Sequence, residues 1–295
     1  MTKALYDRLD DDDLRALEAA FDDQTAAYWA NADPVVRPYL ALHFSAYHGV
    51  TRILDKTGMS ASMPPDDIHA MARGPVAAGG DPWIADLVVE VVERAGGSLG
   101  PGMRGLDFGC SSGRVVRILA AALPEVAWSG CDPNAGAIGW ASEALPGIDF
   151  FVSPQEPPLE LPDGELDMIY AISIWSHFGA DAGLRWLYEM RRLLRPGGLL
   201  VVTTHGLSSL GKQIESGAMV RDTALACSEA LYRSGFWYAD VFGEEGDHGV
   251  VSQEWGMAYM TPEWLLSRLL PSWRALLYEP ARLDANQDVY VLERR

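Results

Sequence analysis

The chain has 295 residues, of which 48% are hydrophobic, and it carries a formal net charge of −18 at pH 7. This length supports one large α/β core with a smaller appended unit. The acidic balance disfavours a nucleic-acid partner and an anionic membrane surface, because both attract clusters of Lys and Arg. No apolar run approaches the roughly 20 residues of a spanning helix, and the first residues lack the apolar core of a signal peptide. We therefore expect a cytoplasmic protein, whose oligomeric state the sequence leaves open.

The three cysteines, Cys110, Cys131 and Cys227, are an odd number and have no metal-ligand spacing. They are typical of reduced thiols in a cytoplasm. The sequence also has no carboxylate-histidine cluster of the kind that holds a catalytic Mg²⁺. We expect no metal site.

The first part of the chain has a helical pattern. The leucines from Leu5 to Leu17 recur with amphipathic spacing, and a helix over Asp86–Arg94 is predicted, with Asp81 as its cap and Pro82 at its first position. We predict no strand before the glycine-rich joint at residues 96–102.

This joint predicts a domain boundary. Residues 1–100 are expected to form an N-terminal helical cap, and residues 101–295 a second domain that begins with a strand.

The segment Gly105 to Leu119 predicts a buried strand, a tight glycine turn and the first turns of a helix. Gly109 and Gly113 bracket small residues, including Cys110, so that backbone N–H groups can approach a ligand. A nucleotide-like cofactor is expected above such a turn. Ser111 replaces the second glycine of the dinucleotide-binding pattern, so the turn alone leaves the cofactor ambiguous.

A second apolar strand ends in Asp132-Pro133, about 20 residues beyond the turn. A carboxylate at this position can accept hydrogen bonds from both ribose hydroxyls. The alternative is that Asp132 caps the helix that starts near Asn134.

Two further strands follow glycine turns. Pro162-Asp163-Gly164 precedes a strand over Leu166–Ile172, and Arg195-Pro196-Gly197-Gly198 ends a helix and precedes a strand over Leu199–Thr204.

With these motifs in this order, residues 101 to 205 resemble the class I methyltransferases that use S-adenosylmethionine. The resemblance implies an α/β fold with a doubly wound, mostly parallel seven-stranded sheet whose last strand is antiparallel. Residues 206–260 are too long for an ordinary connection and are expected to form a substrate-binding insertion after strand five. A helix from Thr261 and strands over Trp273–Tyr278 and Asp288–Glu293 complete the expected sheet.

The resemblance also implies roles for individual residues. Asp107 would support the amino group of the cofactor, the turn from Gly109 through Cys110 to Gly113 would lie along its methionine part, and Asp132 with Pro133 would hold the ribose. The main chain of Ser173, at the end of strand four, would meet the amino group.

The chain departs from the family pattern after strand three. Gln155 stands where an Asp against the adenine amino group is expected, and either Gln155 or the neighbouring Glu156 is a candidate for that contact. Arg73, within the helical cap, is a candidate partner for the cofactor carboxylate, because a guanidinium binds a carboxylate in two places. Both assignments compete with surface positions that are simply solvated.

Two histidines are candidates for accepting a proton from the methyl acceptor. His177 follows strand four and His205 ends strand five, so both are expected at the carboxyl edge of the sheet. His248, beside Asp247, is a third candidate. Each of them competes with a structural histidine that is hydrogen-bonded to the scaffold.

The function that we favour is methyl transfer to a small molecule, either a secondary metabolite or a saccharide-like acceptor. A nicotinamide-dependent oxidoreductase and a non-catalytic cofactor-binding homologue remain alternatives, because of the ambiguous turn and the absence of an unmistakable base.

Overall fold

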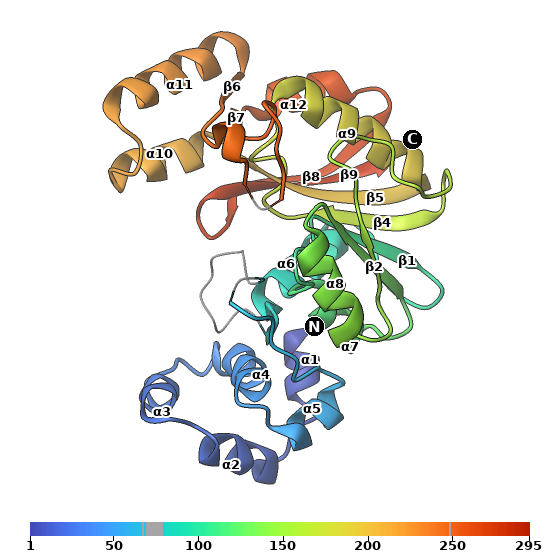
Figure 1. Cartoon of the computed structure of the whole chain (residues 1–295), viewed down its shortest axis with the longest axis vertical. Coiled ribbons are helices and arrows are strands. Elements are labelled where there is room, and N and C mark those ends of the chain that lie inside the picture. Colours follow the sequence, from blue (N-terminus) through green and yellow to red (C-terminus); the bar gives the residue numbers. More distant parts are fainter. Residues whose placement is uncertain (67, 69–78, 248) are drawn as a thin grey trace. The chain divides into compact units, whose positions relative to one another are not determined.

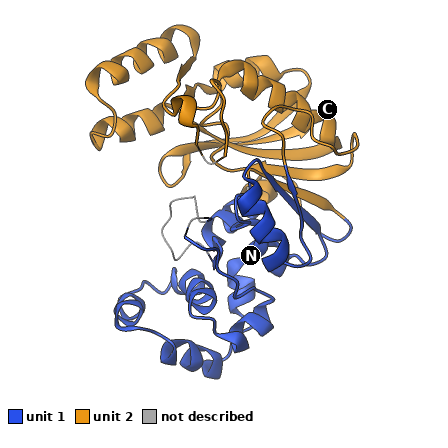
Figure 2. Ribbon diagram, viewed as in Figure 1, with its two compact units in different colours: residues 1–90, 99–102, 110–152 blue, residues 91–98, 103–109, 153–295 orange. Residues whose placement is uncertain are grey.

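The computed structural model describes residues 1–66, 68, 79–247 and 249–295 (Figure 1). The chain divides into two compact units that alternate along the sequence (Figure 2). Unit 1 holds residues 1–90, 99–102 and 110–152, and unit 2 holds residues 91–98, 103–109 and 153–295. The predicted boundary near residue 100 falls where the chain passes between the units, and its status as a domain boundary stays a prediction.

Unit 1 begins with helices. They are α1 (Thr2–Tyr6), α2 (Asp11–Ala19), α3 (Asp23–Ala30), α4 (Arg37–Tyr47), α5 (Thr51–Thr57) and α6 (Pro82–Arg94), the last of which continues into unit 2. The described residues up to 94 include no strand, as the sequence predicts.

The amphipathic pattern of the first leucines spans two helices rather than one. α1 ends at Tyr6, and α2 begins after Asp10, whose carboxylate accepts hydrogen bonds from the backbone N–H groups of Asp12 and Asp13 at 2.9 and 3.0 Å. The Asp13 carboxylate accepts from the Asp10 N–H in return, which completes a capping box. The apolar residues of these helices close around a core of Leu17, Trp29, Leu40, Ala41, Phe44 and Ile53.

The rest of unit 1 is a helix-strand-helix-strand segment. It comprises α7 (Val116–Ala122), β2 (Ala127–Asp132), α8 (Ala135–Ala144) and β3 (Asp149–Val152), and β2 pairs with β3 in parallel. Asp132 is the last residue of β2, as predicted.

Unit 2 contains the remaining strands of the sheet and the helices between them. Its elements are β1 (Arg104–Phe108), β4 (Leu166–Ala171), α9 (Ala180–Leu193), β5 (Leu194–His205), α10 (Leu207–Glu215), α11 (Arg221–Ser234), β6 (Phe236–Ala239), η2 (Gly243–Glu245), β7 (Met257–Met260), α12 (Pro262–Leu269), β8 (Trp273–Leu283) and β9 (Gln287–Arg294). β1 pairs with β4 and β4 with β5 in parallel, whereas β9 is antiparallel to both β5 and β8.

The strand order is β3-β2-β1-β4-β5-β9-β8, a seven-stranded sheet. The order reverses direction after β1, which is the topological switch point of a doubly wound fold. The sequence prediction of a mostly parallel seven-stranded sheet with an antiparallel last strand is therefore confirmed.

The segment between β5 and α12 has its own small core, as its length predicts. α10 and α11 pack on the antiparallel pair β6–β7 around the buried residues Leu210, Cys227, Leu231 and Tyr259. Across the described parts of the chain, no helix has the length and apolarity needed to cross a membrane.

Candidate functional site

The glycine turn after β1 requires glycine at both ends. Gly109 has φ 82°, and a Cβ there would collide with the side chain of Ile174, whose Cγ1 lies 2.7 Å from that position. Gly113 has φ 75°, and its Cβ would lie 2.9 Å from the ring of Phe150. At each end of the turn a Cβ would clash with a side chain of the same unit, so both positions require glycine.

Ser111, which replaces the second glycine of the dinucleotide pattern, also has a left-handed backbone with φ 50°. Few non-glycine residues take this conformation, and where they do the surrounding structure must hold them. Here the Ser111 N–H donates a 2.8 Å hydrogen bond to Oδ2 of Asp132. The strained turn is therefore tied to the end of β2.

Asp132 is nearly buried, with 9% exposure, and its second oxygen accepts a 2.9 Å hydrogen bond from the Asn134 N–H. The cap of α8 is Asn134, whose side chain accepts from the Ala137 N–H at 3.0 Å. The alternative that Asp132 itself caps this helix is therefore wrong. These two backbone hydrogen bonds orient the carboxylate.

The turn is anchored to the start of α6. Asp81 caps α6 through the Ile84 N–H at 3.1 Å, and its other oxygen forms a 3.0 Å ion pair with Arg114. The Asp81 N–H also donates to the Arg114 carbonyl at 2.8 Å. Arg114, just before α7, and Arg117, within it, are both at least nine-tenths buried.

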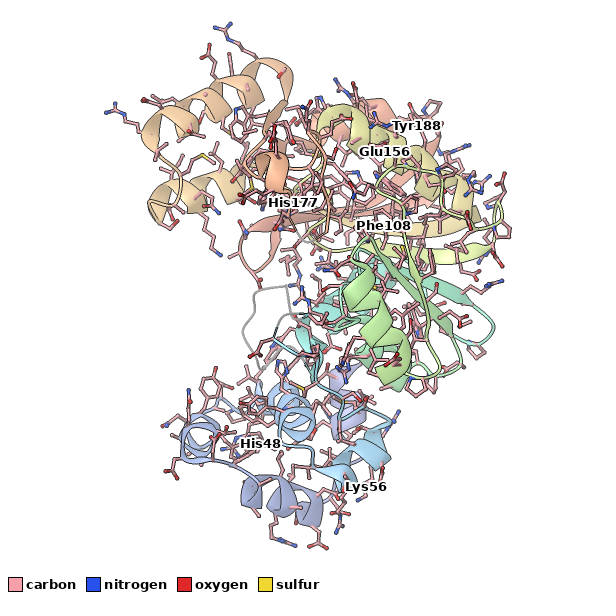
Figure 3. The ribbon with its side chains drawn as sticks, viewed as in Figure 1. His48, Lys56, Phe108, Glu156, His177 and Tyr188 are labelled. Carbon is pink, nitrogen blue, oxygen red and sulfur yellow. The ribbon has the colours of Figure 1, made fainter. Side chains whose placement is uncertain are left out.

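In unit 2, Asp107 lies in β1, is 3% exposed and is in register with Tyr170 of β4. The next residue, Phe108, packs against Trp186 at a ring-centroid distance of 4.7 Å (Figure 3). β1 thus brings a carboxylate to the carboxyl edge of the sheet beside an aromatic core.

Ser173, just beyond β4, has a left-handed backbone with φ 62°. Its N–H donates to Oγ1 of Thr203 at 2.7 Å, and its hydroxyl donates to Oε1 of Gln287 at 3.2 Å. Thr203 also donates to the same Gln287 oxygen at 2.6 Å. This network fixes the backbone of Ser173 with respect to β5 and β9.

The network reaches His205, whose Nε2 lies 3.4 Å from Nε2 of Gln287. The ring of His205 stacks on Tyr259 at 4.9 Å and is 7% exposed. Burial, together with the nearby His177, lowers the pKa of His205 to about 4. His205 is therefore neutral at pH 7 and is a weak proton acceptor.

His177 has a different environment at the same edge (Figure 3). Its Nδ1 lies 2.8 Å from the carbonyl oxygen of Gly256, to which it donates, and its ring is 4.8 Å from that of Trp255. A proton held on Nδ1 assigns the lone pair of the neutral ring to Nε2. His177 therefore has the tautomer that a proton acceptor needs.

Gln155 and Glu156 both contact protein groups. The Gln155 amide donates to the Gly249 carbonyl at 3.2 Å and accepts from the Val251 N–H at 3.1 Å, and Glu156 (Figure 3) pairs with Arg185 at 3.0 Å. The insertion thus holds the segment that follows β3.

Arg73 and His248 lie outside the described residues. Among the residues that are described, no group of three or more His, Cys, Asp and Glu side chains could hold a metal ion.

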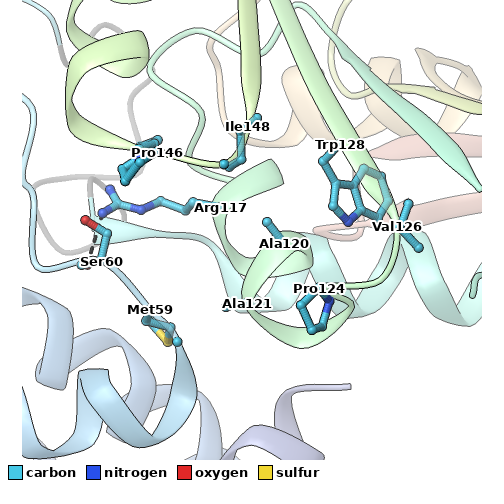
Figure 4. A pocket seen from close by; sticks show the side chains of 13 residues that line it. Met59, Ser60, Arg117, Ala120, Ala121, Pro124, Val126, Trp128, Pro146 and Ile148 are labelled. Carbon is cyan, nitrogen blue, oxygen red and sulfur yellow. Dashed lines mark hydrogen bonds between the residues drawn. The ribbon is translucent and has the colours of Figure 1, made fainter. Parts of the chain in front are cut away.

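A cavity of about 500 Å³ lies elsewhere in unit 1 (Figure 4). Val126 and Ile148, which line it, precede β2 and β3, so it opens at the amino ends of these strands. Arg117 borders it and donates to the carbonyls of Ser60 and Ser62 at 3.0 and 2.7 Å. In open α/β sheets ligands bind at the carboxyl ends of the strands, so this cavity is separate from the candidate site.

Sequence reasoning missed Thr203, Gln287 and the pair Asp81–Arg114 as supports of the site. Thr203 and Gln287 are polar and buried within strands that are otherwise apolar. Their burial follows from the pairing of strands that are far apart in the chain, so no local signal in the sequence indicated it.

Residues 106–198 match the family described as a methyltransferase domain. The chain is similar to a solved S-adenosylmethionine-dependent methyltransferase from Methanosarcina mazei, with 19% identity over 69% of this chain and 96% of that one and a TM-score of 0.47. It is also similar to magnesium protoporphyrin IX methyltransferase from Synechocystis PCC 6803, with 13% identity over 72% and 82% and a TM-score of 0.49. A S-adenosylmethionine-dependent methyltransferase from Aquifex aeolicus matches with 15% identity over 73% and 99% and a TM-score of 0.43.

Proposed function

Because the chain is a class I S-adenosylmethionine-dependent methyltransferase, we propose that its methyl acceptor is a small molecule of the secondary-metabolite or saccharide-like type. The cofactor is S-adenosylmethionine, which sets aside the nicotinamide alternative. The cofactor supplies an electrophilic methyl group on a sulfonium, and the protein supplies proximity and orientation.

We also propose the residues that contact the cofactor. Asp132 with Pro133 would hold the ribose, the turn from Gly109 through Cys110 to Gly113 would follow the methionine part, and Asp107 with Ser173 would hold the amino group. The two backbone hydrogen bonds that orient Asp132, and the network that fixes Ser173, support this assignment. We propose further that Gln155 or Glu156 contacts the adenine amino group, and that Arg73 pairs with the carboxylate of the cofactor.

The observation that carries the small-molecule proposal is the contact between the insertion and His177. Gly256 and Trp255 come from residues 206–260, and they fix the tautomer and the ring position of a histidine at the carboxyl edge. Because residues of the insertion line this edge of the proposed site, the site suits an acceptor of limited size. The net charge of −18 further disfavours an RNA or DNA acceptor.

Within this site we propose His177 as the proton acceptor, with Nε2 as the receiving atom, and His205 as a positioning residue. The Nδ1–Gly256 contact supports the first role. The low pKa of His205 and its place in the Gln287 network support the second.

The test measures the demethylated cofactor released with two panels of acceptors. One panel holds hydroxylated aromatic compounds and saccharides, and the other holds transfer RNA and a bacterial protein extract. We expect turnover with the first panel, lost in Asp132→Ala. Turnover that needs RNA or protein would refute the small-molecule acceptor.

A further inference from the structure

The helical part of unit 1 contains a cavity of about 360 Å³ that no step above uses. It lies among α3, α4 and the first turn of α6. Its lining includes Thr25, Tyr28, His43, Phe44, Tyr47 and Trp83. A volume of this size holds a small molecule with one or two rings.

The walls of this cavity are mostly aromatic. Phe44 is 5% exposed, whereas Tyr28 and Tyr47 are 64% and 40% exposed, so the inner wall is buried and the two tyrosines reach solvent. Trp83 is held in place by Tyr39, which stacks on it at 5.0 Å with an interplanar angle of 14°. Fixed aromatic faces favour a flat, apolar ligand ring.

Two of the polar side chains that line the cavity, Thr25 and His43, are buried. His43 is 5% exposed, and among the described residues its Nδ1 has no hydrogen-bond partner. Burial lowers the pKa of His43 to about 4, so the ring is neutral at pH 7. An unpaired buried polar atom costs free energy, which a ligand with a hydrogen-bonding group would recover.

The charge around the cavity restricts the ligand further. Asp22, at its edge, has its pKa lowered by the backbone N–H of Thr25, so it is ionised at pH 7. The described residues that line the cavity include neither Lys nor Arg. An anionic ligand is therefore disfavoured, and a neutral ring fits.

The cavity is linked to the cofactor turn through α6. Trp83 is two residues beyond Asp81, which caps α6 and pairs with Arg114, the residue that follows Gly113. A ligand that contacts Trp83 thus contacts the helix start to which the turn is anchored.

From these observations we propose that the cavity is a binding site for a neutral aromatic molecule with a hydroxyl group of the phenol type. A hydroxyl can donate or accept, so it pairs with Nδ1 of His43 in either tautomer.

The test uses 4-methylphenol as the probe, with the full chain and without cofactor, followed by calorimetry or by tryptophan fluorescence. Toluene, which lacks the hydroxyl, and benzoate, which is an anion, are the matched probes. We expect saturable binding of 4-methylphenol, and binding of toluene and benzoate that is about tenfold weaker or absent.

Three variants locate the binding. His43→Phe keeps the ring volume but removes the hydrogen bond, and should weaken 4-methylphenol about tenfold without weakening toluene. Tyr28→Ala, at an exposed position that the core does not need, should weaken both probes. Tyr47→Phe keeps the aromatic face and should leave binding unchanged.

Binding of 4-methylphenol that is equal in wild type, His43→Phe and Tyr28→Ala would overturn the proposal, as would no binding at all. Its failure is distinguishable from failure of the proposed function. If only RNA or protein supports turnover, the small-molecule function fails, while the binding data still report whether this cavity holds a phenol ring.

Discussion

A shift from pH 7.5 to pH 5 should destabilise the unliganded protein through its two buried histidines. Burial lowers the pKa of both His43 and His205 from 6.5 to about 4. Between these two values the unfolded chain binds more protons than the folded one, so the stability is fully present above pH 6.5 and is lost as the pH falls toward 4. At pH 5 the loss is about 2 kcal/mol for each histidine and about 4 kcal/mol for both.

Urea denaturation of wild type, His43→Gln and His205→Gln at the two pH values measures this effect. Groups common to all three proteins cancel in the comparison. Asp288, for example, has its pKa raised by burial and therefore acts in the opposite direction in each of them. Each variant should lose about 2 kcal/mol less than wild type between pH 7.5 and pH 5. An identical pH dependence in wild type and both variants would refute the assignment of buried neutral histidines.

Three further outcomes are expected. Gly109→Ala should lower the free energy of unfolding by about 1–3 kcal/mol and weaken cofactor binding, because the φ of Gly109 is positive and Ile174 fills the space beside it. Gly139→Ala, in an open position of α8, should instead raise the free energy of unfolding by about 0.5–1 kcal/mol. Equal melting curves for the two variants would contradict this. Residues 206–260 should gain hydrogen-exchange protection when cofactor and substrate bind, and unchanged protection would identify static architecture. With a hydroxyl acceptor, His177→Gln should lower turnover about 10²–10⁴-fold and flatten its pH profile at little change in cofactor affinity. His205→Gln should have a smaller effect, and full activity of both variants would remove histidine from the proton transfer.

The elements of the sheet could be predicted from the sequence because their signals are local. A glycine turn after Phe108 and Asp132 at the end of an apolar strand each depend on a few neighbouring residues. Pro196-Gly197-Gly198 correctly indicated a nearby strand, but β5 already begins at Leu194, so these residues lie within the strand and not before it. The cap of α12 by Thr261 was predictable for the same reason, since its side chain accepts from the Trp264 N–H at 3.2 Å.

The supports of the site could not be predicted because they join residues that are far apart in the chain. Ser173 meets Gln287 across 114 residues, and His177 meets Gly256 across 79. The burial of Arg117 could not be predicted either, because its spacing from the apolar residues of α7 is that of an exposed helix face. The carbonyls of Ser60 and Ser62, supplied by a distant segment, accept hydrogen bonds from its guanidinium and lower the cost of that burial.

The central claim is that this chain binds S-adenosylmethionine through Asp132 and the glycine turn. Calorimetry of the full chain with S-adenosylmethionine, with its demethylated product and with NAD tests it most directly. We predict saturable binding of both adenosyl ligands, no binding of NAD, and a loss of about 1–3 kcal/mol in Asp132→Ala. Saturable binding of NAD with no response to either adenosyl ligand would contradict the account.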